Sequence, residues 1–175
     1  LLDSFRLGAM ILNSGFIPTY MIAVWRGATP IGVAVQEVLQ FHGVNTDHIA
    51  IRTSSYSGID EQSNKIAVHG LNYLVKNITQ EDRLLVVDDV LDTGLTIQAI
   101  IAELERKARL NTPSEIRVAV PYYKPSRNKT SIIPDYFIHT TEAWLKFPHS
   151  LEGLSVEEIA EHRPDLNEIL SQAIS

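Results

Sequence analysis

One segment, residues 84–96, limits most strongly what this chain can fold into. Four apolar residues end in the adjacent carboxylates Asp88 and Asp89, and a third carboxylate follows at Asp92. A small polar turn then leads into residues 97–108, whose apolar positions have helical spacing. The pattern predicts a buried strand that feeds a loop at the N-terminus of a helix. In an open α/β sheet, ligands bind at such loops.

The residues of this turn suit a phosphorylated sugar. Carboxylates suit hydroxyl groups and Mg2+, whereas the free amides at a helix start suit phosphate. Gly94 lets the backbone approach a phosphate closely, and Thr93 and Thr96 add hydroxyl donors. The alternative interpretation is a solvated loop in which Asp92 only caps the helix. Because two adjacent carboxylates repel each other and lose hydration at a strand end, the full pattern favours a binding site.

The remaining chain alternates between strand and helix patterns, which favours a parallel sheet covered on both faces. The polar residues 54–64 are expected to form a mobile loop, and residues 65–77 fit a strand or a helix. Trp25 is expected to pack in the core. The predicted strands are 20–25, 49–53, 84–88, 115–120 and 136–139, and the predicted helices are 1–13, 31–41 and 97–108.

The C-terminal tail has a different pattern. Ser155 and Glu158 have the spacing of a capping box, and Pro164 can open a second short helix that runs to residue 174. We therefore expect one domain over residues 1–150 and a C-terminal helical extension of that domain over residues 151–175.

Length, charge and composition narrow the function classes. The 175 residues suit one domain with a full core. A net charge of -6 argues against a nucleic-acid or membrane surface, and the lack of cysteine excludes disulfides and cysteine-based zinc sites. Apolar runs are too short to span a membrane. A cytoplasmic enzyme is the expectation.

Residues 84–96 resemble the signature of the type I phosphoribosyltransferase family that binds 5-phosphoribosyl-1-pyrophosphate (PRPP). The aspartate at position 92 is similar to that of the 6-oxopurine branch, whose members use hypoxanthine, guanine or xanthine. The resemblance covers residues 20–148. It implies an α/β fold with a mostly parallel central sheet flanked by helices and a flexible flap, to which the tail adds a C-terminal helical hairpin.

Two further loops are similar to PRPP-contacting loops of the family. Arg26, Gly27 and Ala28 resemble the pyrophosphate loop, which in relatives often contains a non-proline cis peptide. The usual family pattern is Arg-Gly-Gly, so Ala28 departs from it. Ser55 and Tyr56 resemble the catalytic flap that closes over PRPP and excludes water. The alternative interpretations are a plain turn for Arg26, Gly27 and Ala28, and a mobile surface loop for Ser55 and Tyr56.

The resemblance also implies that residues 121–150 of the domain form its base-binding segment. Lys124 matches the lysine that contacts purine O6, Trp144 would stack on the purine ring, and the backbone around Leu145 would read the 2-position. The alternatives are a solvated lysine and a tryptophan that fills the core.

The resemblance implies transfer of a phosphoribosyl group to a purine nitrogen, with release of pyrophosphate. Asp88 and Asp89 would hold the ribose hydroxyls, directly or through the cofactor Mg2+, and Asp92 would take the N7 proton. The 5′-phosphate would bind to Thr93, Gly94, Leu95 and Thr96. The expected partners are PRPP and a purine base, without nucleic acid or membrane, in a homodimer or homotetramer.

Three rival functions remain open from the sequence. Some relatives bind PRPP as a signal and regulate nucleotide metabolism. A transferase for a different base, such as a pyrimidine, is a second possibility, which Asp92 and Lys124 disfavour. A third is an interaction module that uses the tail hairpin. The sequence does not choose among hypoxanthine, guanine and xanthine.

Overall fold

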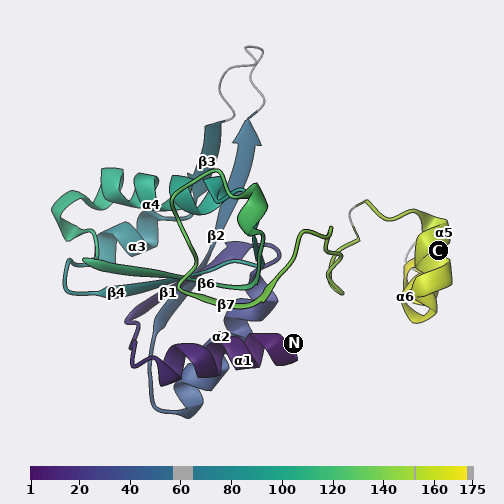
Figure 1. The fold of residues 1–175 in the computed structure, drawn as a ribbon, viewed down its shortest axis with the longest axis horizontal. Coiled ribbons are helices and arrows are strands. Elements are labelled where there is room, and N and C mark those ends of the chain that lie inside the picture. Colours follow the sequence, from purple (N-terminus) through teal and green to yellow (C-terminus); the bar gives the residue numbers. More distant parts are fainter. Residues whose placement is uncertain (57–64, 152, 173–175) are drawn as a thin grey trace. The chain divides into compact units, whose positions relative to one another are not determined.

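A computed structural model describes residues 1–56, 65–151 and 153–172 of the chain. The chain divides into two compact units, Leu1–Trp144 and Leu145–Ser175, which we describe separately. The first unit contains the sheet and the helices that cover it (Figure 1).

The first unit is built on one mixed sheet with the strand order β3-β2-β1-β4-β6-β5, with β7 paired to β6. All neighbouring strands run parallel except β2 and β3, which are antiparallel. The predicted mostly parallel α/β fold is therefore confirmed. The strands are β1 (Tyr20–Trp25), β2 (Asp47–Tyr56), β3 (Lys65–His69), β4 (Arg83–Val87), β5 (Val90–Leu91), β6 (Glu115–Tyr123) and β7 (Tyr136–Thr140).

Helices cover both faces of this sheet, and the two-residue period of the strands divides their side chains between two cores. Ile22 and Val86 belong to the core under α3 and α4, whereas Met21 and Leu85 belong to the core under α1 and α2. Figure 1 shows the two helix pairs on opposite sides of the sheet. The helices of this unit are α1 (Leu2–Asn13), α2 (Thr29–Phe41), α3 (Asn72–Asn77) and α4 (Leu95–Ala108), with short 3-10 turns η1 (Arg109–Asn111) and η2 (Pro125–Arg127).

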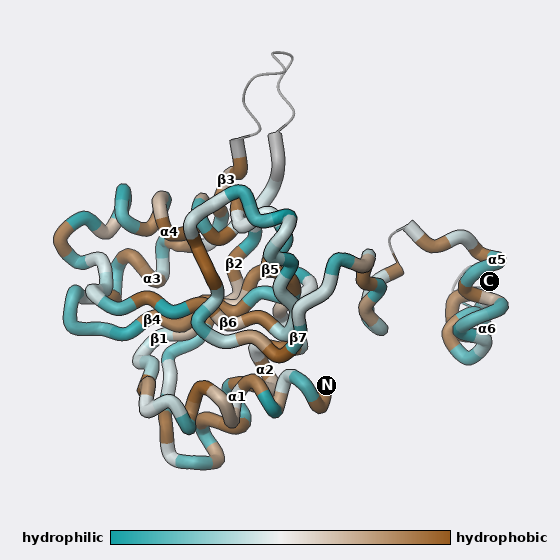
Figure 2. Tube along the Cα trace, viewed as in Figure 1, coloured by the Kyte–Doolittle hydropathy of each residue, from teal (hydrophilic) through white to brown (hydrophobic). Residues whose placement is uncertain are grey.

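Helix α4 illustrates how the pattern fixes the packing. Ile97, Ile100 and Leu104 recur at helical spacing and are fully buried against the sheet. Hydrophobic and hydrophilic residues alternate along this helix in Figure 2, as expected for an amphipathic helix on a sheet. Burial of each large aliphatic side chain contributes about 1.5–3 kcal/mol.

The segment after residue 53 differs from the prediction of a loop. Residues Ser54 to Tyr56 continue β2 and pair with β3, so the strand extends three residues into the predicted loop. The rest of that predicted loop, 57–64, lies outside the described residues. The ambiguous residues 65–77 form both structures, β3 and then α3; Gly70, which follows β3, has a φ of +93°, a conformation that favours glycine. The two-residue strand β5 was not predicted.

The second unit contains α5 (Val156–His162) and α6 (Pro164–Gln172). The predicted capping box is confirmed, because Ser155 Oγ accepts from Glu158 N and the Glu158 carboxylate accepts from Ser155 N. The Arg163 guanidinium donates to the carbonyl oxygens of Phe147 and Pro148, which ties the segment before α5 to the helices. Among the described residues, no helix is long and apolar enough to cross a membrane.

Candidate active site

The loops predicted to bind PRPP follow β1 and β4, where the strand order of the sheet changes direction. From β1 the chain passes through α2 to β2 on one side, and it later returns as β4 on the other side of β1. The carboxyl ends of β1 and β4 therefore border the crevice in which open α/β sheets bind ligands. Arg26 follows β1, and Asp88 follows β4.

The loop after β1 packs directly on the acidic turn. A Cβ added to Gly27 would lie 2.6 Å from Asp89 Cγ and closer still to Oδ2, so only glycine leaves room for that carboxylate. The peptide bond between Trp25 and Arg26 is cis, as expected from the resemblance. Ala28 has a right-handed helical conformation (φ -77°) and is fully buried as the N-cap of α2, so this position does not need the usual glycine.

The acidic pair lies between β4 and β5. Asp88 is 8% exposed, and one of its carboxylate oxygens accepts from Asp89 N at 2.9 Å. Burial, and then the neighbouring Asp89 carboxylate, raise the pKa of Asp88 well above its usual value. A cation at this site would offset both costs, and a hydroxyl donor would offset the loss of hydration.

These carboxylates fit a magnesium ion that is shared with a substrate. No group of three or more acidic, histidine or cysteine side chains that could form a metal site occurs among the described residues. Mg2+ is commonly held by one or two carboxylates together with substrate phosphates, so Asp88 and Asp89 suffice for that arrangement.

The predicted phosphate loop opens α4. Gly94 is the N-cap residue and has a φ of +76°, a conformation that favours glycine. Leu95 N donates to Thr93 Oγ1 at 3.4 Å, and the amides that follow at the helix start have no acceptor within the helix. Asp92 is not the cap, contrary to the alternative interpretation.

Asp92 follows β5 and Lys124 follows β6, and their side chains form an ion pair. Lys124 Nζ lies 3.4 Å from Asp92 Oδ2, and its backbone N donates to Leu91 O. At 2% exposure Lys124 is not the solvated lysine of the alternative interpretation. Its Nζ lies 5.8 Å from the ring centroid of Trp144, which is 77% exposed and therefore does not fill the core.

A second cation at Asp92 was not predicted. Arg127 Nε lies 2.7 Å from Asp92 Oδ1 as an ion pair, but its N–H does not point along a hydrogen-bond direction. This oxygen is buried and accepts no hydrogen bond from any residue in the described part of the chain. The carboxylate therefore lies between two cations, Lys124 and Arg127, with its Oδ1 atom buried.

The geometry agrees with the comparisons to known proteins. The family model "Phosphoribosyl transferase domain" matches residues 7–158. The chain belongs to the phosphoribosyl transferase family. This phosphoribosyltransferase is thus an enzyme of the glycosyltransferase type, and no curated protein matches its sequence.

Solved structures share the fold over most of their length. A purine phosphoribosyltransferase from Pyrococcus horikoshii is 28% identical with a TM-score of 0.68, covering 87% of this chain and 90% of its own. A hypoxanthine phosphoribosyltransferase from Trypanosoma cruzi in complex with IMP has a TM-score of 0.68 at 17% identity, covering 93% and 89%. A Neisseria gonorrhoeae protein with bound ppGpp has a TM-score of 0.68 at 23% identity, covering 95% and 90%.

The structure does not assign three of the predicted site residues to this candidate active site. Ser55 and Tyr56 end β2, but their side chains lie outside what the structure describes. Leu145 begins the second unit. One prediction near the site is wrong, because Trp25 is 56% exposed rather than packed in the core; it is the last residue of β1, beyond the helix cover.

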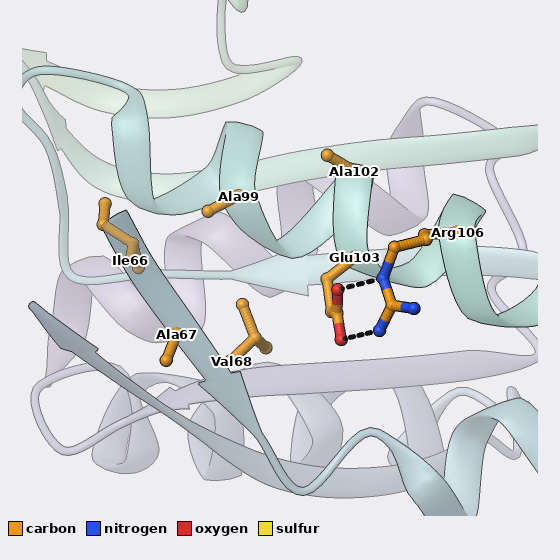
Figure 3. Close-up of a pocket in the computed structure, with 7 residues that line it drawn as sticks. All are labelled: Ile66, Ala67, Val68, Ala99, Ala102, Glu103 and Arg106. Atoms are coloured by element: carbon orange, nitrogen blue, oxygen red, sulfur yellow. Dashed lines mark hydrogen bonds and ion pairs between the residues drawn. The ribbon is translucent and has the colours of Figure 1, made fainter. Parts of the chain in front are cut away.

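A separate hollow of about 600 Å3 lies between β3 and α4 (Figure 3). Apolar side chains such as Ile66 and Ala99 line it, and the paired Glu103 and Arg106 side chains lie at one end. None of the predicted site residues lines this hollow. This hollow is therefore separate from the candidate active site.

Proposed function

We propose that this phosphoribosyltransferase transfers the 5-phosphoribosyl group from PRPP to a 6-oxopurine, namely hypoxanthine, guanine or xanthine, in purine salvage. The observation that carries the proposal is the pair of Asp92 and buried Lys124, 3.4 Å apart, beside the exposed ring of Trp144. An alternative acceptor would have to satisfy the same pair of groups.

The pair complements one edge of a 6-oxopurine. That edge presents an N–H at N7, which needs a hydrogen-bond acceptor, and a carbonyl oxygen at C6, which needs a donor. The Asp92 carboxylate has only acceptor oxygens, and the Lys124 ammonium has only donors. Adenine carries an amino group at C6, so its donor would face the Lys124 ammonium without an acceptor. The proposal therefore favours oxopurines over adenine.

The PRPP half of the site rests on the crevice between β1 and β4. In the proposal Asp88 and Asp89 hold the ribose 2′- and 3′-hydroxyls, and Arg26 with the amides of its loop faces the pyrophosphate. Bound Mg2+ would neutralise charge on the leaving pyrophosphate. The 5′-phosphate occupies the N-terminus of α4, where the turn Thr93, Gly94, Leu95 and Thr96 supplies amides and hydroxyls.

The chemical step needs placement and one proton acceptor. The bond between C1′ and the pyrophosphate oxygen breaks, and its electron pair leaves with pyrophosphate. The lone pair of purine N9 forms the new bond to C1′, and Asp92 takes the proton from N7. Ser55 and Tyr56 would exclude water, and backbone near Leu145 would read the 2-position. The homo-oligomer and the cytoplasmic location stay predictions.

The test is product identification after incubation with PRPP, Mg2+ and each of hypoxanthine, guanine and xanthine. We expect a nucleoside monophosphate and pyrophosphate in equal amounts with at least one base. Saturable PRPP binding without product from any base would contradict the transferase and would support a PRPP-sensing regulator. Product only with a pyrimidine would contradict the assignment of the acceptor.

A further inference from the structure

A loop that the mechanism above does not use covers the phosphate-binding turn. A Cβ added at Gly94 would lie 2.7 Å from Asn128 Oδ1 and closer still to Thr130 Oγ1. The backbone N of Lys129 donates to Thr93 O at 3.0 Å. The glycine of the phosphate turn is therefore required by a neighbouring loop as well as by its own positive φ.

Asn128 organises this loop with both ends of its amide. Its Oδ1 accepts from Thr130 N and Thr130 Oγ1, each at 2.9 Å. Its Nδ2 donates to Ile132 O at 2.7 Å and to Tyr123 OH at 3.2 Å. Tyr123 directly precedes Lys124, so one side chain connects the end of β6 to the turn that begins α4.

The other end of the loop contacts the candidate base site. Arg127 ends η2 and lies 2.7 Å from the Asp92 carboxylate, which it shares with Lys124. At 49% side-chain exposure, Arg127 approaches the carboxylate from solvent, whereas Lys124 is buried. Arg127 therefore orients Asp92 from the solvent side, while Lys124 orients it from within.

We propose that residues 127–130 form a positioning loop with two separable actions. Asn128 and Thr130 fix the phosphate-binding turn, and Arg127 fixes the proton-accepting carboxylate. The proposal rests on the proposed function for its second action. The first action concerns affinity for a sugar phosphate and is measured without turnover.

The first experiment measures binding of ribose 5-phosphate by titration calorimetry. Asn128→Ala should weaken binding about tenfold, the effect of one or two lost hydrogen bonds. Thr130→Val keeps the side-chain volume and should also weaken binding. This second variant supplies the test if Asn128→Ala folds poorly. Asn77→Ala is the matched control, because it removes an amide hydrogen bond to Tyr73 O at the end of α3.

The second experiment compares kcat with the KM for PRPP. Arg127→Ala should lower kcat about tenfold through misplacement of Asp92, with ribose 5-phosphate affinity unchanged, and Arg127→Lys should restore part of kcat. Asn128→Ala should instead raise the KM for PRPP. A similar fall in kcat together with a similar rise in the KM for PRPP in both variants would show a general structural role and would overturn the proposal.

Failure of this inference is distinct from failure of the proposed function. Unchanged ribose 5-phosphate binding in both Asn128→Ala and Thr130→Val would overturn the loop's role even in an active enzyme. Ribose 5-phosphate binding that depends on Asn128, in a protein that forms no nucleotide, would support the loop's first action and overturn the transferase. No ribose 5-phosphate binding by the wild-type protein would overturn the loop's first action, whereas only product formation from PRPP decides the transferase.

Discussion

Replacement of Asp92 by asparagine tests the proton acceptor while it preserves the shape of the site. The substitution removes the charge that lies 3.4 Å from Lys124 Nζ and 2.7 Å from Arg127 Nε, and an amide cannot accept the N7 proton. Loss of a general base costs about 10²–10⁴ in rate, or about 3–5 kcal/mol of transition-state stabilisation. We therefore expect kcat to fall by that factor.

The same variant should leave the PRPP half of the site intact. Asp88 and Gly94 are not partners of the substituted carboxylate, so the affinity for PRPP should change by less than about threefold, no more than a weak hydrogen bond contributes. The free energy of unfolding should fall by about 1–3 kcal/mol, because Lys124 stays buried beside an amide oxygen instead of a carboxylate.

The assay is steady-state kinetics with PRPP and hypoxanthine varied in turn, with thermal unfolding of the same samples. Asp47→Asn is the matched control, since Asp47 begins β2 at the opposite end of the strands and accepts a hydrogen bond from Tyr73. Equal losses of turnover and PRPP affinity in Asp92→Asn would refute the general-base role.

Three further substitutions test other parts of the account. Lys124→Met, which keeps the buried stem, should raise the KM for hypoxanthine about tenfold or more and spare PRPP binding; abolished PRPP binding in equilibrium titrations would contradict the placement of this lysine. Gly27→Ala should weaken PRPP binding at least about tenfold, because the new methyl group displaces the Asp89 carboxylate; unchanged affinity would show that the loop adapts freely. Glu103→Gln should cost about 0.5–1 kcal/mol of unfolding free energy above pH 5, measured by denaturant titration. Hydrogen bonding from Arg106 lowers the pKa of Glu103 to about 2, so this contribution is present above the unfolded pKa near 4.5 and disappears as pH falls towards 2. A difference that persists at pH 2 would refute the ion pair as its source.

Local patterns were sufficient to predict the elements that carry the site. β1 was predicted because it is a short apolar run, and α4 because its apolar residues recur at helical spacing. The acidic turn was predicted because it ends an apolar run. β3 and α3 were left ambiguous, since a few residues fit either period. The edge position of β3 depends on pairing with β2, which its own residues do not specify.

The contacts of the 127–130 loop could not be predicted from any local pattern. Arg127 and Asn128 follow a strand in a polar segment that resembles an ordinary surface connection. Their partners, Asp92 and Gly94, lie more than 30 residues earlier, and the contact depends on how β5 and β6 end beside each other. The burial of Lys124 has the same origin, because a lysine is most often exposed.

The central claim is that Asp92 and Lys124 read the edge of a 6-oxopurine. The most direct measurement is kcat/KM for hypoxanthine, guanine and xanthine against adenine, uracil and orotate, with PRPP and Mg2+ in each assay. The account predicts that at least one 6-oxopurine exceeds adenine by about 10³ or more, since a site of fixed donors and acceptors rejects a base that leaves them unpaired. Equal or better use of adenine, or of a pyrimidine, would contradict it.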